Sequence, residues 1–262
     1  IQNLGVVAAS DRFEGYAAER SMILDFIVQR GITNVVFIAA DIHGTFVNNL
    51  TYQLNPRGPQ LPTGAFEVTT GSVAYWAPFG QTVMGLLFRL GFLPPSQYEA
   101  YLALPQVLKD GFVQNIMNAL LVGLGYDPLG LAGSEIDAEL LDGAYTIVHT
   151  FGWTAFEIDA STAALTVSTY GIAPYGADDL LADPDAVTAR VPALLGRFRV
   201  MPTGVGCPGD VSGSGDVGAD DLAVLLAAWG PNRGHAADFN GDGDVGPSDL
   251  AILLGQWGPC PG

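Results

Sequence analysis

The sequence predicts a mixed α/β domain followed by a small all-α domain of loops and helices. Segments with helical and strand-like patterns alternate over residues 1–202, as they do in layered α/β folds. From residue 203 onward the chain is rich in Gly and Asp, and the stretch at Asp238 repeats the stretch at Asp210, 28 residues earlier. The stretch 201–206 has the composition of a linker. We therefore expect two domains, residues 1–202 and residues 203–262, and call the second one the tail.

The composition limits the classes of partner. The chain has 262 residues, with 10 Lys and Arg against 27 Asp and Glu, and a formal net charge of −17. Such an acidic surface repels phosphate backbones and anionic lipid, so we expect no nucleic-acid-binding surface. No run of about 18 apolar residues lacks Pro, Gly or charge, so we expect no membrane span. The chain begins at Ile1 without a signal peptide, and we expect a processed or shortened protein.

The first predicted elements are a helix and a strand. Residues 15–31 have the pattern of an amphipathic helix, with Phe26 on its apolar face and Gly31 at its end. Residues 34–40 form a continuous apolar run of β-formers, which predicts a strand buried on both faces. Polar residues begin abruptly at Asp41, and sites in α/β folds collect at the carboxyl ends of such strands.

The rest of the first domain is predicted to contain several helices and five more strands. The helices are expected within residues 81–142, packed on one another. The strands are expected at residues 65–70, 145–150, 153–158, 165–169 and 197–200, the last at a sheet edge. A turn between the third and fourth of these makes the sheet at least partly antiparallel.

Each copy of the tail repeat places oxygen-bearing side chains at alternate positions of a loop, followed by one helix. Loop positions 1, 3, 5, 7 and 12 are Asp210, Ser212, Ser214, Asp216 and Asp221 in the first copy, and Asp238, Asn240, Asp242, Asp244 and Asp249 in the second. These groups converge on one ion when the loop coils, Gly at position 6 permits the sharp turn, and position 7 offers its backbone carbonyl. The spacing predicts two Ca²⁺ sites. The second loop is expected to bind more tightly, because it has three carboxylate ligands against two.

The helices of the two copies repeat the same apolar pattern, and we expect their leucines to form one small core. These leucines are Leu222, Leu225, Leu226, Leu250, Leu253 and Leu254. The loops also match the dinucleotide fingerprint G-x-G-x-x-G. No buried strand leads into them, and their aspartates would repel a pyrophosphate, so a nucleotide site is not expected there.

Two cysteines flank the repeat. Cys207 precedes the first copy and Cys260 follows the second, which favours a disulfide over two unrelated buried thiols. A disulfide implies an oxidising location outside the cytoplasm, where calcium is also plentiful.

The tail resembles the dockerin type I repeat, in which each loop ends in Asp and each copy has one helix. The resemblance implies a cohesin-like or cell-surface partner and an extracellular or cell-surface location. In that family, loop positions 10 and 11 help to dock the cohesin, commonly as small hydroxyl residues. Here they are Ala219–Asp220 and Pro247–Ser248, and neither pair fits, which weakens the expectation of a cohesin.

Asp41 and His43 are the candidate metal ligands of the first domain. They leave the predicted strand 34–40 two residues apart and can face one metal cluster, although D-x-H alone also fits a capping Asp and a surface His. The wider pattern resembles the PhoD-like alkaline phosphatases. Residues 11–20 are D-R-F-E-G-Y-A-A-E-R and residues 34–43 are N-V-V-F-I-A-A-D-I-H, against D-x-W-x-G-Y-x-x-E-R and N-V-V-x-L-x-G-D-x-H in the family.

The resemblance implies the C-terminal part of a calcineurin-like metallophosphoesterase, a β-sandwich flanked by helices. It implies hydrolysis of phosphomonoesters or phosphodiesters at an iron–calcium cluster, with Asp41 and His43 as ligands and catalytic residues. The family's other ligands precede the matched region, and His149 and His235 lack the neighbours to replace them. His149 is expected to be structural. We therefore expect this chain to lack phosphatase activity on its own.

Three functions follow as alternatives. The first is a secreted metal-dependent phosphatase with a calcium-binding tail for anchoring or assembly. The second is a non-catalytic, calcium-dependent binding or anchoring protein with a degenerate phosphatase-like domain. The third, a polysaccharide-degrading enzyme, rests only on the company that dockerins keep, and no paired carboxylates in the first domain support it.

Overall fold

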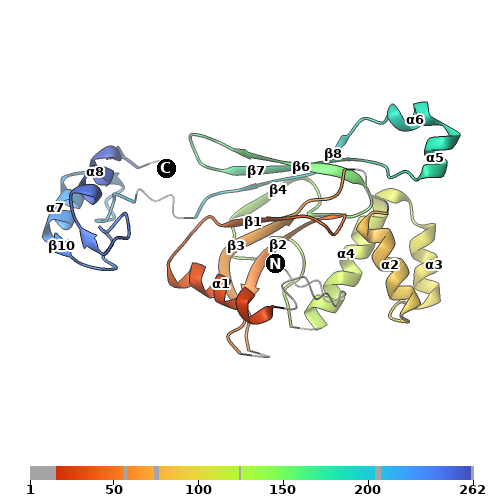
Figure 1. Cartoon of the computed structure of the whole chain (residues 1–262), viewed down its shortest axis with the longest axis horizontal. Helices are drawn as coiled ribbons and strands as arrows, with labels where there is room; N and C mark the ends of the chain where they lie inside the picture. The colour runs from red at the N-terminus through yellow and green to blue at the C-terminus, as the bar shows by residue number, and fades with distance from the viewer. Residues whose placement is uncertain (1–15, 56–57, 74–76, 124, 204–207, 261–262) are drawn as a thin grey trace. The chain divides into compact units, whose positions relative to one another are not determined.

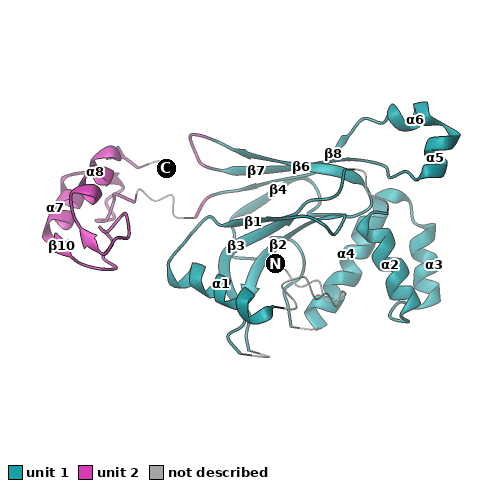
Figure 2. Cartoon of the chain, viewed as in Figure 1, with its two compact units in different colours: residues 1–159, 164–201 teal, residues 160–163, 202–262 magenta. Residues whose placement is uncertain are grey.

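The computed structural model describes residues 16–55, 58–73, 77–123, 125–203 and 208–260 (Figure 1). The chain divides into two compact units, residues 1–159 with 164–201 and residues 160–163 with 202–262 (Figure 2). The described part of the first unit has two four-stranded sheets and six helices, a mixed α/β architecture as predicted.

The first sheet has the strand order β1-β3-β2-β5. Its strands are β1 (Val36–Ala39), β3 (Leu61–Thr69), β2 (Thr45–Tyr52) and β5 (Thr146–Ile147). β1 runs parallel to β3, and the other neighbours are antiparallel. The predicted strand at residues 34–40 is confirmed as β1, but its expected burial on both faces is wrong. β1 lies at the sheet edge, and Ile38 is 63% exposed.

The second sheet has the order β4-β8-β7-β6 and is antiparallel throughout. Its strands are β4 (Ala138–Gly143), β8 (Ala193–Val200), β7 (Leu165–Ile172) and β6 (Phe151–Ile158). The prediction of an edge strand at residues 197–200 is wrong, because β8 lies between β4 and β7. The two sheets share one hydrophobic core, in which Phe66 of β3 meets Phe198 of β8 edge to face with ring centroids 6.2 Å apart.

Helices cover the first sheet. α1 (Ala17–Gln29) buries Leu24 and Ile27 against Leu50 of β2. Its end forms the expected glycine cap, since Gly31 adopts φ 61° and Ile32 N–H donates to Ile27 C=O. Phe26, expected on the buried face, is 52% exposed, and its ring lies under the Arg30 guanidinium, with Cζ 5.3 Å from the ring centroid.

Five further helices complete the first unit. α2 (Phe79–Arg89), α3 (Pro95–Ala103) and α4 (Gln106–Gly123) pack on one another around Phe46 of β2, as predicted for this stretch. The short α5 (Ala177–Ala182) and α6 (Pro184–Thr188) follow β7. No helix within the described residues is both long enough and apolar enough to span a membrane.

The tail contains two copies of a loop and a helix, α7 (Ala219–Ala227) and α8 (Pro247–Gly255). Four two-residue strands accompany them, β9 (Asp216–Val217), β10 (Gly230–Pro231), β11 (Asp244–Val245) and β12 (Gly258–Pro259). β9 pairs with β12 and β10 pairs with β11, so each loop pairs with the segment that follows the other copy's helix. The tail is therefore not purely all-α as expected, because it also contains these four short strands.

The core of the tail includes Leu225, Leu253, Val217 and Val245, all buried. The expectation that all six leucines enter this core is wrong for Leu226 and Leu254, each 52% exposed. Two helices can turn only one face each toward a shared core, and these leucines lie beside that face.

Candidate functional site

The strand-end cavity lies where the parallel strands β1 and β3 both end. Parallel strands place their carboxyl ends at one edge of a sheet, so residues 40–43 after β1 and residues 70–72 after β3 come together. The two segments line a cavity of about 760 Å³, and Phe79 and Thr82 of α2 line it as well. Asp41 and His43, expected together from their spacing, therefore border the same cavity.

The backbone that carries these two residues adopts left-handed conformations. Asp41 has φ 81° and His43 has φ 57°. Such conformations cost non-glycine residues about 1–3 kcal/mol each and persist only where the surroundings hold them. Phe79 N–H donates to His43 C=O at 3.0 Å, and Thr70 N–H donates to Ala39 C=O at 2.8 Å. The fold thus holds a strained turn at this sheet edge, with the Asp41 side chain exposed and the His43 side chain half-buried.

A buried network around His149 fixes the amino end of α2 and thereby the strained turn. His149 is fully buried; its Nδ1 lies 2.7 Å from Asp110 Oδ1, and its Nε2 lies 2.8 Å from the Tyr101 hydroxyl. Burial raises the pKa of Tyr101, so its phenol keeps its proton. Gly80 packs on the imidazole so closely that a Cβ there would lie 2.2 Å from ring Cε1. His149 is therefore structural, as predicted.

The strand-end cavity contains one unsatisfied polar group, the hydroxyl of Ser72. Its oxygen is buried and has no hydrogen-bond partner among the described residues, while Ser72 C=O accepts from Gly152 N–H at 3.0 Å. A buried hydroxyl without a partner costs free energy unless a ligand or water completes it. The cavity therefore suits a polar ligand.

The donors in this cavity fit a metal by type but not by number. A carboxylate and an imidazole suit iron and other transition metals. Among the described residues, however, no three His, Cys, Asp or Glu side chains come together as a metal centre. Asp41 and His43 alone are too few ligands for two metal ions. Residues 11–15 of the matching motif lie outside the described part of the chain.

The carboxylates at position 12 close the two tail loops. Asp249 is 1% exposed and accepts from the N–H groups of Phe239 and Gly246, both at 2.8 Å. Asp221, fully buried, accepts from Ser212 N–H and Gly218 N–H, also at 2.8 Å. Burial alone would raise the pKa of each carboxyl, but these N–H donors outweigh it and lower both pKa values.

The aspartates at position 1 differ between the copies. Asp210 accepts from Gly215 N–H and Ser214 N–H at 2.8 Å each, and the Gly215 bond is the main reason its pKa is lowered. Asp238 accepts through Oδ2 from Gly243 N–H at 3.0 Å, while its Oδ1 is buried without a hydrogen-bond partner in the described chain. A buried carboxylate oxygen without a hydrogen-bond partner is suited to bind a cation.

The remaining loop positions fit the expected coiling. Gly215 and Gly243 at position 6 have φ 93° and 95°, which favours glycine. In the first loop, the Ser214 hydroxyl donates to Asp216 C=O at 3.0 Å, so two expected ligands face each other. In the second loop, Asp242 accepts from the Asn240 side-chain amide at 2.9 Å. An all-oxygen donor set fits Ca²⁺ by type, but within the described residues the carboxylates of neither loop come together as a group of three.

Sequence reasoning did not single out Ser72 or Thr82 of the strand-end cavity. Thr82 comes from a helix about forty residues downstream and has no local signal. Cys207 lies outside the described residues, so its disulfide with Cys260 stays a prediction.

Two family models match the chain, each in a separate segment. Residues 2–85 match the family model for the PhoD-like phosphatase, a stretch that includes Asp41 and His43 and ends within α2. Residues 208–256 match the model for the dockerin type I domain and include both tail loops. No curated protein and no solved structure matches the chain. The chain thus joins a segment that matches PhoD-like phosphatases to a tail that matches dockerin type I domains, as the sequence predicts.

Proposed function

We propose that this chain is part of a secreted, metal-dependent phosphatase that hydrolyses phosphomonoesters or phosphodiesters and carries a calcium-binding tail. In this proposal residues 1–202 are the phosphatase-like domain and residues 203–262 the dockerin-like domain. The observation that carries it is the strained turn Asp41–His43 at the edge of a 760 Å³ cavity, inside the segment that matches the phosphatase family. Strain held at a cavity is typical of functional sites.

The architecture supports the finer fold assignment. Two four-stranded sheets share one core, and helices cover the first of them. This arrangement is compatible with the C-terminal part of a metallophosphoesterase sandwich, and we propose that fold class for the first domain.

The proposed roles follow from the chemistry of each side chain. Asp41 and His43 would supply an oxygen and a nitrogen ligand to iron and calcium, with further ligands from elsewhere in the protein. Such metals, when bound, polarise phosphoryl oxygens and activate water. The Ser72 hydroxyl, which has no partner among the described residues, would donate a hydrogen bond to a phosphoryl oxygen. The backbone bond from Phe79 to His43 would keep the imidazole in place during turnover.

The test compares histidine variants of the protein, assayed on an activated phosphodiester with iron and calcium. His43→Ala is expected to lower turnover at least a hundredfold. His235→Ala, in the segment between the tail loops, is the matched control and is expected to leave turnover unchanged. Equal activity of His43→Ala and the parent protein would refute the proposal.

Exposed Leu and Trp side chains on the tail support the anchoring role. The repeat places Leu226 and Trp229 of one copy and Leu254 and Trp257 of the other at equivalent positions, each between 46% and 52% exposed. Exposed Trp and Leu side chains of this kind mark interaction surfaces. We propose a cohesin-like or cell-surface protein as the partner, in an extracellular setting. Titration of a cohesin domain with and without calcium, using Trp229→Ala and Trp257→Ala, tests this.

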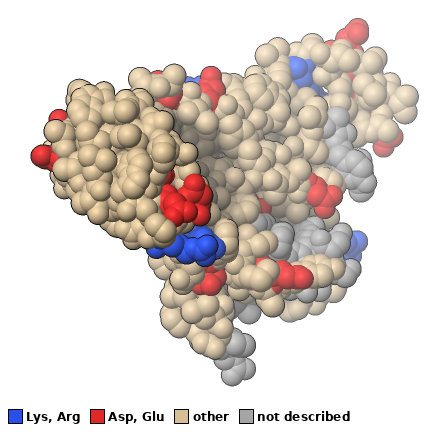
Figure 3. Space-filling model, turned by 60° about the vertical axis from the view of Figure 1, so that its left-hand side comes forward, with Lys and Arg blue, Asp and Glu red and all other residues tan. Residues whose placement is uncertain are grey.

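The charge distribution supports a protein or small-molecule partner over nucleic acid. On the face drawn in Figure 3, Lys and Arg side chains are few and scattered, and they form no broad basic patch among the described residues. A nucleic-acid-binding surface needs such a patch.

The second candidate, a non-catalytic anchoring protein, is favoured by one observation. Among the described residues that line the strand-end cavity, Asp41 and His43 are the only His, Cys, Asp or Glu side chains. Metal analysis of the protein separates the two functions, since a degenerate domain would retain calcium in the tail but no iron.

A further inference from the structure

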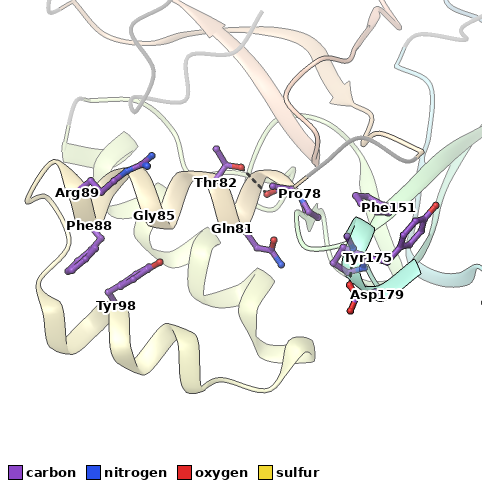
Figure 4. Close-up of a pocket in the computed structure, with 13 residues that line it drawn as sticks. Pro78, Gln81, Thr82, Gly85, Phe88, Arg89, Tyr98, Phe151, Tyr175 and Asp179 are labelled. Carbon is purple, nitrogen blue, oxygen red and sulfur yellow. Dashed lines mark hydrogen bonds between the residues drawn. The ribbon is translucent and has the colours of Figure 1, made fainter. Parts of the chain in front are cut away.

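A second cavity lies along α2 beside the strand-end cavity. It has a volume of about 560 Å³, within the range of small-molecule sites. We call it the helix-side cavity (Figure 4). Thr82 lines both cavities, so the two spaces are neighbours. A molecule whose phosphate occupied the first would have its organic group at the second.

Aromatic rings form two walls of the helix-side cavity. Phe88 of α2 and Tyr98 of α3 stack with centroids 4.4 Å apart and planes 9° apart. Facing them across the cavity, Tyr175 lies edge to face with Phe151, with centroids 5.3 Å apart (Figure 4). Stacked rings with exposed area bind other flat rings, and base–aromatic stacking contributes about 1–3 kcal/mol per base.

Two polar side chains at this cavity have no partner within the described chain. Neither the Gln81 amide nor the Arg89 guanidinium forms a side-chain hydrogen bond or ion pair with a described residue, although both line the cavity. An amide can pair with the donor and acceptor on the edge of a heterocycle, and a guanidinium binds oxygen-rich or anionic substituents. Asp179, on the far wall, already accepts from Gly176 N–H at 2.8 Å.

Gly85 keeps this cavity open. It lies inside α2, where glycine costs about 1 kcal/mol relative to alanine. Its backbone does not require glycine, and a Cβ there would meet only the Tyr98 hydroxyl, at 3.8 Å. Local packing therefore gives no reason for glycine at this position, whereas a ligand in the cavity does.

We propose that the helix-side cavity binds the organic group of a phosphoester that carries a flat nitrogen heterocycle, as in a nucleoside monophosphate. The heterocycle contacts the aromatic walls of the cavity, its edge pairs with Gln81, and Arg89 binds oxygen substituents. This assignment rests on the proposed function, because it places the phosphate beside Asp41 and His43. A single nucleotide carries far less charge than the polynucleotides that the acidic surface repels.

The test is calorimetric binding of adenosine, AMP and glycerol 3-phosphate to the full chain. Adenosine and AMP are expected to bind the parent protein. Gly85→Leu is expected to weaken both at least tenfold by filling the cavity, without affecting glycerol 3-phosphate. Gly111→Leu in α4 is the matched control, since nothing lies within 4 Å of a Cβ there, and it should leave all three unchanged. Gln81→Ala, at an exposed side chain, should weaken adenosine binding without affecting the melting temperature.

The outcomes separate this inference from the proposed function. His43→Ala is expected to leave adenosine binding intact, because adenosine has no phosphate. If adenosine does not bind the parent chain, or binds Gly85→Leu and Gln81→Ala as well as the parent, the inference is overturned, whatever the hydrolysis assay shows. If adenosine binding follows these variants while His43→Ala leaves hydrolysis unchanged, the inference stands and the phosphatase assignment falls.

Discussion

The tail loops and the strand-end cavity gather their polar groups in opposite ways. Each loop takes its oxygen atoms from twelve consecutive residues, and backbone N–H groups of the same loop orient them. The strand-end cavity combines two strand ends with a helix, and its strained turn depends on a hydrogen bond from α2. The ligand positions of a tail loop are specified by local sequence, although β9 and β11 also pair with segments of the other copy. A site like the strand-end cavity exists only when the whole unit has folded.

The largest expected effect comes from removing a position-12 carboxylate. Asp249→Ala should abolish calcium binding to the second loop and lower the melting temperature of the tail. The substitution leaves the N–H groups of Phe239 and Gly246 without their acceptor. Each such group that is buried lowers the free energy of unfolding by about 1–3 kcal/mol. Calorimetric titration and thermal melting measure both effects. Asp244→Ala is the control, because only the carbonyl of that residue is an expected ligand; an equal loss there would contradict the scheme.

A methyl group at Gly80 should disturb the first unit and leave the tail intact. Gly80→Ala drives a Cβ into the His149 ring, and such overpacking costs about 1–3 kcal/mol. The melting transition of the first unit should shift downward while the calcium titration stays unchanged. Gly85→Ala, one helix turn further along α2, should be neutral or stabilising. A change in calcium affinity in Gly80→Ala would show that the two units are coupled.

The two loops should differ in affinity by about tenfold or more, with the second tighter, because loop affinity rises with ligand charge. Asp238→Ala should remove the tighter calorimetric event and Asp210→Ala the weaker one. Ser214→Asp, which gives the first loop the position-5 carboxylate of the second, should narrow the gap. The reverse assignment of the two events would contradict the charge argument.

The smallest effect is the acid sensitivity of the calcium-free tail. The folded pKa values of Asp210, Asp221 and Asp249 are lowered, so their ionised forms stabilise the fold above the unfolded pKa. That contribution is expected to be full above about pH 5 and to be lost as the pH falls below about 4. Melting temperatures from pH 7 to pH 3 check this. Asp249→Asn should flatten the profile, whereas Asp220→Asn should not.

The contrast between local spacing and long-range packing also explains which parts of the fold the sequence predicts. The tail loops, their repeat and the helix at α1 follow from spacing and capping alone. β2 escaped prediction because it is buried on both faces yet carries Asn48, Asn49 and Thr51, so it shows neither alternation nor an apolar run. The central position of β8 in its sheet was not predicted, because Arg197 and Arg199 are typical of a strand exposed to solvent. Arg197 instead donates to the Ser168 hydroxyl at 3.0 Å on the neighbouring strand.

The candidate site divides along the same line. Asp41 and His43 were predicted to lie together because only Ile42 separates them in the chain. Ser72 and Thr82 join them only through the parallel pairing of β1 with β3 and the docking of α2. No local pattern encodes those contacts, because they depend on packing between distant segments.

The reciprocal pairing in the tail makes the two copies inseparable. β9 in the first loop pairs with β12 after the second helix, and Cys260 N–H donates to Gly215 C=O at 3.1 Å. Deleting the residues from 258 onward is therefore expected to disorder the first loop, which lies at the other end of the tail sequence. The second loop is expected to stay folded. A single copy expressed alone would expose two bare strand edges. It would regain its partners only by pairing with another copy of itself, so one half of the tail should behave as an exchanging homodimer.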